Sequence, residues 1–94
     1  MTQKEIFHSS VYFGGRVQGV GFRYHTLQIA KEFEVSGYVR NLVDGRVQVE
    51  AEGEKSEVEG FIAEICDRLS MFIRKTELSE NWREPVFRGF TIGR

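Results

Sequence analysis

The sequence has almost no cysteine, almost no proline and almost no net charge. Its single cysteine, Cys66, cannot form a disulfide within the chain, so we expect a reducing, cytoplasmic environment. The formal net charge of -1 argues against a surface built mainly for nucleic acid, and we expect no nucleic-acid partner. No apolar run approaches the roughly 20 residues that a membrane span needs. The first residues also lack a basic region followed by an apolar stretch, so we expect no signal peptide and no membrane association.

What remains is the composition of a small folded protein. Ninety-four residues, 40% of them hydrophobic, suit one globular domain over residues 1–94. Charged residues of both signs are interspersed along the chain, which argues against disorder. We find no internal repeat, low-complexity tract or linker, and nothing in the sequence requires a second copy. We therefore expect a single domain that acts as a monomer.

The first half of the chain alternates between strand and helix patterns. Residues 6–14 alternate as a strand with one buried face. A helix is predicted to begin at Phe22 and to be stopped by Gly37, and residues 38–43 read as a second strand. Five residues recur at helical spacing and should form the buried face of this helix: Phe22, Thr26, Ile29, Ala30 and Phe33.

A tight hairpin is predicted where the second strand ends. Asp44–Gly45 is a strong signal for a type I′ turn, which needs positive φ at both central residues. Residues 46–53 alternate cleanly between apolar and polar side chains and read as the third strand. The second helix should open at Ser56, with Glu59 completing a capping box.

Two further strands are predicted at residues 73–82 and 86–92. The order is then β-α-β-β-α-β with one additional strand, which favours a ferredoxin-like α/β sandwich. We expect an antiparallel sheet of about five strands with both helices on one face. This fold hosts many functions, so the function has to come from a site.

The segment GRVQGVGFR, residues 15–23, joins the first strand to the first helix and is the best candidate site. Consecutive backbone N–H groups in such a loop can form a concave nest for an anion, and the following helix N-terminus adds unpaired donors. Arg23 could close over the anion with a bidentate contact. On spacing alone, an anion site and a glycine-rich connection that binds nothing are equally good readings. The segment matches neither the Walker nor the dinucleotide-binding pattern.

This segment and GYVRNLVDGRVQVEAEG, residues 37–53, together resemble both signature stretches of the acylphosphatase family. The first is similar to G-x-V-Q-G-V-x-F-R and the second to G-[aromatic]-V-[basic]-N-x3-G-x-V-x5-G, in the family's order and at about its spacing. The resemblance implies a compact five-stranded sandwich. It also implies hydrolysis of a carboxylic–phosphoric mixed anhydride to carboxylate and inorganic phosphate, with small-molecule acyl phosphates as substrates.

The resemblance also assigns roles to individual residues. It implies that Arg23 is the phosphate-binding catalytic arginine and that Asn41 orients the attacking water. It further implies that the phosphate sits in a cradle of backbone amides from Arg16, Val17, Gln18, Gly19, Val20, Gly21 and Phe22. Such roles fit phosphoryl transfer, which depends on positioning and charge neutralisation. The two motifs contain no metal-ligand cluster and no general acid, so we expect no metal and no cofactor, and a leaving group that departs readily as an anion.

Three departures from the family pattern concern packing more than chemistry. Phe13 stands where a smaller aliphatic residue is usual, residues 69–77 lack a Gly-Pro pair, and the fourth predicted strand is unusually polar. Cys66 falls on the apolar stripe of the second helix and is read as a core residue rather than a nucleophile.

Three other readings of the same residues were weighed. An RNA-recognition module shares the element order, but the polar face of its third strand would here carry Glu50 and Glu52, which repel phosphates. A phosphate-binding regulator without turnover would not need both Arg23 and Asn41. Similar domains also form part of a hydrogenase maturation protein that handles carbamoyl phosphate, and a free-standing enzyme is the simpler expectation for this short chain.

Overall fold

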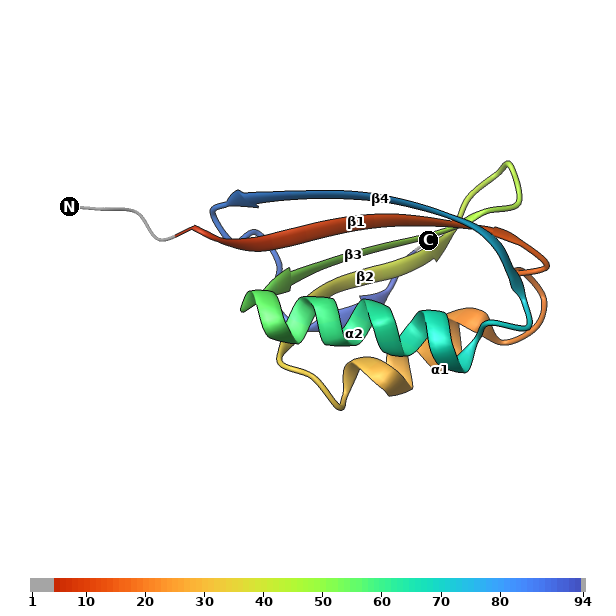
Figure 1. Ribbon diagram of the computed structural model, residues 1–94, viewed down its shortest axis with the longest axis horizontal. Helices are drawn as coiled ribbons and strands as arrows, with labels where there is room; N and C mark the ends of the chain where they lie inside the picture. The colour runs from red at the N-terminus through yellow and green to blue at the C-terminus, as the bar shows by residue number, and fades with distance from the viewer. Residues whose placement is uncertain (1–4, 94) are drawn as a thin grey trace.

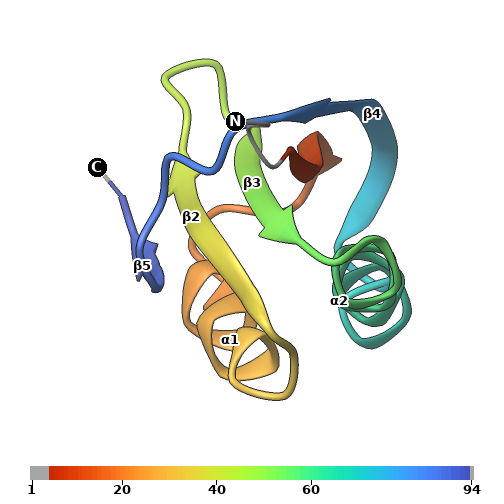
Figure 2. The same ribbon diagram turned by 90° about the vertical axis from the view of Figure 1, so that its left-hand side faces the viewer.

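The fold is described from a computed structural model of the protein, over residues 5–93. Its elements, in chain order, are β1 (Ile6–Gly15), α1 (Phe22–Ala30), β2 (Val35–Asn41), β3 (Val47–Gly53), α2 (Lys55–Arg68), β4 (Ile73–Arg83) and β5 (Phe90–Ile92). The strands form one sheet in the order β4-β1-β3-β2-β5. Both helices cover the same face of that sheet (Figures 1 and 2). The predicted ferredoxin-like sandwich is confirmed.

The sheet is mixed, and the expectation of a purely antiparallel sheet was wrong at one edge. β5 pairs with β2 in parallel, with Gly37 opposite Phe90 and Val39 opposite Ile92. The other neighbouring strands pair antiparallel. The chain reverses direction between β4 and β5, and this direction is the one that β2 already has. The short last strand therefore cannot pair antiparallel with β2.

Gly37 is a strand residue rather than a helix stop. Helix α1 ends at Ala30, and β2 begins at Val35, earlier than predicted. The backbone of Gly37 has φ of +152°, and a Cβ placed there would lie 1.8 Å from the carbonyl oxygen of Glu50 on β3. The glycine is required because the backbones of β2 and β3 approach each other too closely at this point for a side chain.

The hairpin between β2 and β3 is not the type I′ turn that was predicted. Within residues 5–93 only glycines have positive φ, so Asp44 does not adopt the conformation that this turn requires. Instead, the Gly45 N–H donates to the Leu42 carbonyl, and Gly45 alone is left-handed, with φ of +97°. The Asp44 carboxylate accepts a hydrogen bond from the Arg46 N–H and so stabilises the longer loop.

Two further element boundaries differ from the prediction. Helix α2 begins at Lys55 after Glu54, and no side chain caps it, so the expected Ser56–Glu59 capping box does not form. The last strand is shorter than residues 86–92. Its predicted first residues instead donate their N–H groups to the carboxylate of Glu52, in the Val86 and Phe87 hydrogen bonds. A side-chain acceptor replaces the strand ladder there.

The hydrophobic core fills the space between the sheet and the helices. The predicted buried face of β3 is confirmed, with Val47, Val49 and Ala51 buried, and so are four of the five residues predicted on α1, namely Phe22, Thr26, Ile29 and Ala30. Phe33, the fifth, lies beyond the end of α1 and is only partly buried against the core. Cys66 packs half-buried at the edge of this core, and burial raises the pKa of its thiol. No helix within residues 5–93 is both long enough and apolar enough to cross a membrane.

The face of the sheet opposite the helices carries a connected polar network. Glu50 on β3 accepts hydrogen bonds from the Tyr38 hydroxyl and the His8 ring, and the Arg83 guanidinium lies 3.6 Å from its carboxylate. Burial alone would raise the pKa of Glu50, but these partners outweigh burial and hold that pKa below its usual value of 4.5. The network therefore favours the ionised carboxylate in the folded protein.

This lowered pKa gives a stability prediction. A carboxyl whose pKa is depressed by folding contributes stability above its unfolded pKa, and that stability is lost as the pH falls through the folded pKa. Glu50→Gln is expected to lower the free energy of unfolding at pH 7 by about 1–2 kcal/mol, because hydrogen bonds to a charged group are lost. The loss should shrink below pH 4. Urea unfolding at pH 7 and pH 3.5 measures it, with exposed Glu54→Gln as control. A loss that is equal at both pH values would contradict the prediction.

Candidate active site

The glycine-rich loop between β1 and α1 is held by one backbone hydrogen bond and shaped by its glycines. The Arg16 N–H donates to the carbonyl of Phe72, at 2.9 Å, where the chain enters β4. Gly19 and Gly21 have φ of +79° and +82°, a conformation that side chains rarely adopt. A Cβ on Gly19 would meet nothing within 4 Å, so that glycine faces open space. The loop thus turns sharply and leaves its backbone accessible.

The backbone N–H groups of residues 17–22 have no acceptor within residues 5–93, neither a carbonyl nor a side-chain oxygen. They lead directly into α1, whose N-cap is Gly21 and whose first turn has no side-chain cap. Unpaired donors at a helix N-terminus, together with the positive end of the helix dipole, suit an anion. The Arg16 amide was expected in this cradle, but its hydrogen bond to Phe72 removes it from the set.

The side chain of Gln18 ties this loop to the β2–β3 hairpin. Its Nε2 donates to the Leu42 carbonyl at 2.8 Å and to the Arg46 carbonyl at 3.0 Å. Sequence reasoning used only the backbone amide of Gln18 and missed this tether. The hairpin begins immediately after Asn41, so the tether fixes the loop relative to that residue.

Gln18→Leu tests the tether, because leucine keeps the size of the side chain and removes both hydrogen bonds. The Leu42 and Arg46 carbonyls each retain a backbone partner, so the change orphans no acceptor. If the acyl phosphates implied by the sequence resemblance are the substrates, kcat/KM for them should fall about tenfold, since small misplacements of a positioning group are costly. Steady-state kinetics measure it. Gln28→Leu on α1 is the matched control, and equal activity of the two variants would contradict the tether's role.

A pocket of about 260 Å³ brings the loop, α1, β2 and β5 together. It is lined by Val17, Gly19, Gly21, Phe22, Arg23, Tyr24, Asn41 and Ile92. The structure thus places the two predicted catalytic side chains, Arg23 and Asn41, in one pocket with part of the predicted cradle. Gln18 and Val20 belong to the loop but do not line this pocket.

Arg23 and Asn41, which both line the pocket, have no side-chain partner among the described residues. Arg23 is exposed on the first turn of α1 and has no ion pair with any of residues 5–93. Asn41 is half-buried at the end of β2, and its Oδ1 is buried without a hydrogen-bond partner among the described residues. An unpaired buried acceptor is costly, and in native proteins such groups usually serve a function or hold water. The pocket is therefore lined by an unpaired cation, Arg23, by part of the loop that carries the free N–H donors, and by Asn41, whose buried Oδ1 has no partner among the described residues.

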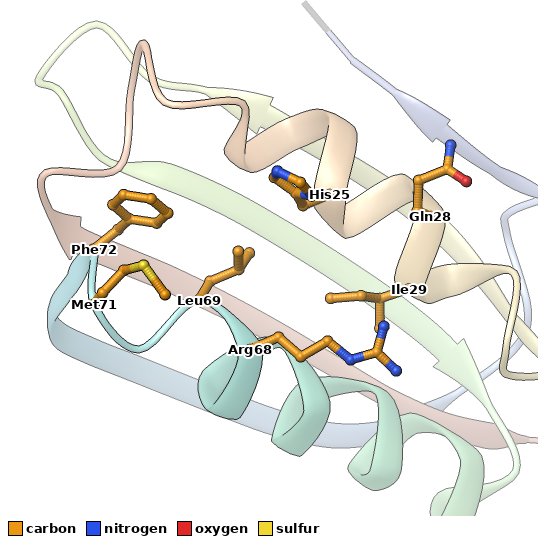
Figure 3. A pocket seen from close by; sticks show the side chains of 7 residues that line it. All are labelled: His25, Gln28, Ile29, Arg68, Leu69, Met71 and Phe72. Carbon is orange, nitrogen blue, oxygen red and sulfur yellow. The ribbon is translucent and has the colours of Figure 1, made fainter.

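A larger pocket, of about 470 Å³, lies between the helices and is a different kind of site. Figure 3 shows His25 and Ile29 on α1 facing Leu69 and Phe72 after the end of α2. Its arginine, Arg68, is already paired with Glu32 and Glu64. No nest of free N–H groups opens into it within residues 5–93, so it lacks the means to hold a phosphate. Over the whole of residues 5–93, no cluster of three or more His, Cys, Asp or Glu side chains could hold a metal ion.

The family model, the curated relatives and the solved structures similar to this chain point to the same family. A family model described as Acylphosphatase matches residues 9–92. The acylphosphatase of Archaeoglobus fulgidus is 47% identical over 55 residues, which are 58% of this chain and 62% of that protein. The acylphosphatase of Nostoc sp. is 45% identical over 93 residues, which are 98% of this chain and 91% of that protein. Among solved structures, acylphosphatase from Bacillus subtilis superposes with a TM-score of 0.84 at 27% identity, covering 94% of this chain and 99% of that one.

Proposed function

Because the chain belongs to the acylphosphatase family, whose function is the hydrolysis of acyl phosphates, we propose that its active site is the pocket between the glycine-rich loop and Asn41. One observation carries this assignment. The free N–H groups of residues 17–22, the exposed Arg23 and the unpartnered Asn41 all belong to one small part of the molecule. A phosphoryl group and a water are the ligands that these groups together suit.

The phosphoryl group is held by the N–H groups of residues 17–22 and by Arg23. The transition state of phosphoryl transfer spreads negative charge over the equatorial oxygens, and preorganised donors stabilise that charge without reorganising. The guanidinium of Arg23 can bind two oxygens at once, which fixes the orientation of the group. Because no residue among 5–93 pairs with Arg23, it needs to break no ion pair to do so.

Asn41 orients the water that attacks phosphorus. Asn41 lines the pocket, and its side-chain amide can hydrogen-bond one water, which limits the directions in which that water can approach. The water oxygen bonds to phosphorus as the bond from phosphorus to the acyl oxygen breaks, and the carboxylate leaves with the electron pair. The proton lost by the water passes to a phosphate oxygen. A carboxylate needs no protonation to leave, which fits a site without a general acid.

Hydrolysis of benzoyl phosphate by the purified protein tests this assignment. We expect turnover in the presence of EDTA, competitive inhibition by inorganic phosphate, and very poor hydrolysis of p-nitrophenyl phosphate, because an ester oxygen is a worse leaving group here. Phosphate binding without turnover would instead support a phosphate-responsive regulator. An equal rate on the simple ester would contradict the anhydride specificity.

The remaining expectations are a cytoplasmic monomer with no nucleic-acid partner. The free thiol of Cys66 forms no disulfide, which suits a reducing compartment. The connection between β4 and β5 argues against an RNA-binding sheet face, because Glu52 accepts hydrogen bonds from the Val86 and Phe87 N–H groups and is buried. An RNA-binding sheet would need exposed aromatic side chains on that face, on which bases can stack. Sedimentation and an RNA titration would test both points.

A further inference from the structure

The candidate active site has an apolar side that phosphate binding does not use. Two of its lining residues, Tyr24 and Ile92, are large hydrophobic side chains that are 59% and 41% exposed. Exposed apolar side chains are ordinary when they are scattered singly, but these two wall the same small pocket. A ligand that covers them removes apolar surface from water, which favours its binding.

The pairing of β5 with β2 places Ile92 beside Asn41. Ile92 is the register partner of Val39, and the Gly93 N–H donates to the Val39 carbonyl at 2.8 Å. Val39 is fully buried toward the helices, and Asn41 lies two residues further along the same strand. Because alternate residues of a strand share a face, Val39, Asn41 and Ile92 lie on the same face of the sheet. Ile92 thus extends the apolar core surface toward Asn41.

Tyr24 reaches the same pocket from the other side. It follows Arg23 on the first turn of α1, so a rigid helix fixes it relative to the guanidinium. Its ring packs edge-to-face against His25, with ring centroids 5.8 Å apart. Figure 2 shows α1 and β5 as neighbours beside β2, the arrangement that brings the two apolar walls together.

The charge of the pocket limits what these walls can hold. Arg23 is the single charged side chain among the eight described residues that line the pocket. In the proposed reaction the phosphoryl group occupies Arg23, which leaves no cation for a second anionic group. An acyl group with its own carboxylate would lose water around that charge without gaining a partner, and this is costly.

Resting on the proposed function, we propose that Tyr24 and Ile92 form the acyl-group subsite and select uncharged, apolar acyl phosphates. Aromatic or branched aliphatic acyl groups are preferred over small ones, and both over acyl groups that carry a second carboxylate. Tyr24 and Ile92 are specificity-determining residues in this scheme and take no part in the chemistry at phosphorus.

The test compares kcat/KM for benzoyl, acetyl and succinyl phosphate in the wild type, Tyr24→Ala and Ile92→Thr. Leu78→Thr is the control, because Leu78 is a similarly exposed apolar residue on β4, at the opposite edge of the sheet. We expect each pocket variant to lower the benzoyl-to-acetyl ratio about threefold to tenfold, the low end of what an apolar contact contributes to discrimination. The ratio cancels the intrinsic reactivity of the two anhydrides, since that reactivity is the same for every variant.

Inhibition by inorganic phosphate separates the subsite from a general loss of structure. Its inhibition constant should be unchanged in both pocket variants, because phosphate does not touch the acyl subsite. An unchanged benzoyl-to-acetyl ratio in both variants overturns the inference, and so does a wild type that prefers succinyl phosphate. A wild type that hydrolyses none of the three overturns the proposed function itself, whereas the other two results leave that function standing.

Discussion

Arg23→Ala is expected to lower kcat/KM for benzoyl phosphate about a thousandfold, the scale on which arginines act in phosphoryl transfer. The reason is that Arg23 is the only charged side chain among the described residues that line the pocket, so no neighbour can replace it. Inhibition by inorganic phosphate should weaken as well, because the same guanidinium binds the product. Steady-state kinetics with benzoyl phosphate and phosphate measure both effects.

Two further variants make the Arg23 result specific. Arg23→Lys should recover part of the loss, since lysine restores the charge without the bidentate geometry. Arg88→Ala removes an exposed arginine outside this pocket and should leave the kinetics unchanged. Arg23 lies on the exposed surface of α1, so the folded state should survive its replacement. Full activity in Arg23→Ala would refute its assigned role.

Asn41→Ala is expected to lower kcat about a hundredfold, the scale set by removing one positioned hydrogen-bonding group from an active site. The inhibition constant of inorganic phosphate should change little, because Asn41 acts on the water and not on the phosphoryl group. Asn41→Asp should do more harm. A carboxylate in the same place would repel the bound phosphate and should therefore weaken phosphate inhibition in addition to slowing turnover.

The split between turnover and phosphate binding is what distinguishes the two residues. Asn81→Ala is the control for Asn41→Ala, because Asn81 contacts His8 on the face of the sheet away from the helices. That variant should keep full activity. If Asn41→Ala weakened phosphate inhibition as strongly as Arg23→Ala does, Asn41 would be a phosphate ligand, and the assignment of the water to it would be wrong.

Local patterns in the sequence predicted the elements that carry these residues. The alternation of β3 and the helical spacing of α1 identify buried faces directly, since each residue's side is set by its position in a regular element. The two signature stretches likewise located Arg23 and Asn41, because both lie inside them. The regular periodicity of strands and helices was therefore readable from residue order, whereas the turn type at Asp44–Gly45 and the cap of α2 were not.

Two of the errors have a different cause, which is contact between residues distant in the sequence. Gly37 looked like a helix stop because its true reason, the nearby carbonyl of Glu50, belongs to another strand. The early part of the last predicted strand is held by Glu52 instead of a strand partner. Neither contact leaves a periodic signal near the residue that it affects.

Ile92 was missed in the site for the same reason. Three apolar or β-branched residues near the chain end indicate a strand, but they do not say which strand they pair with or in which direction. Only the parallel pairing with β2 brings Ile92 to the pocket. The tether from Gln18 was equally hidden, because its acceptors are backbone carbonyls. Every residue has a backbone carbonyl, so residue identity does not reveal which ones accept this hydrogen bond.

The position of β1 in the sheet also has a consequence for how the chain folds. β1 pairs with β3 on one side and with β4 on the other, where Phe7 lies opposite Trp82. The second edge of β1 is therefore covered only when β4, near the end of the chain, pairs with it. Such distant pairings cost loop-closure entropy before they are rewarded, and chains rich in them fold slowly. During synthesis, β1 leaves the ribosome long before β4 does, and its uncovered edge is the part of the nascent chain most open to pairing with another molecule.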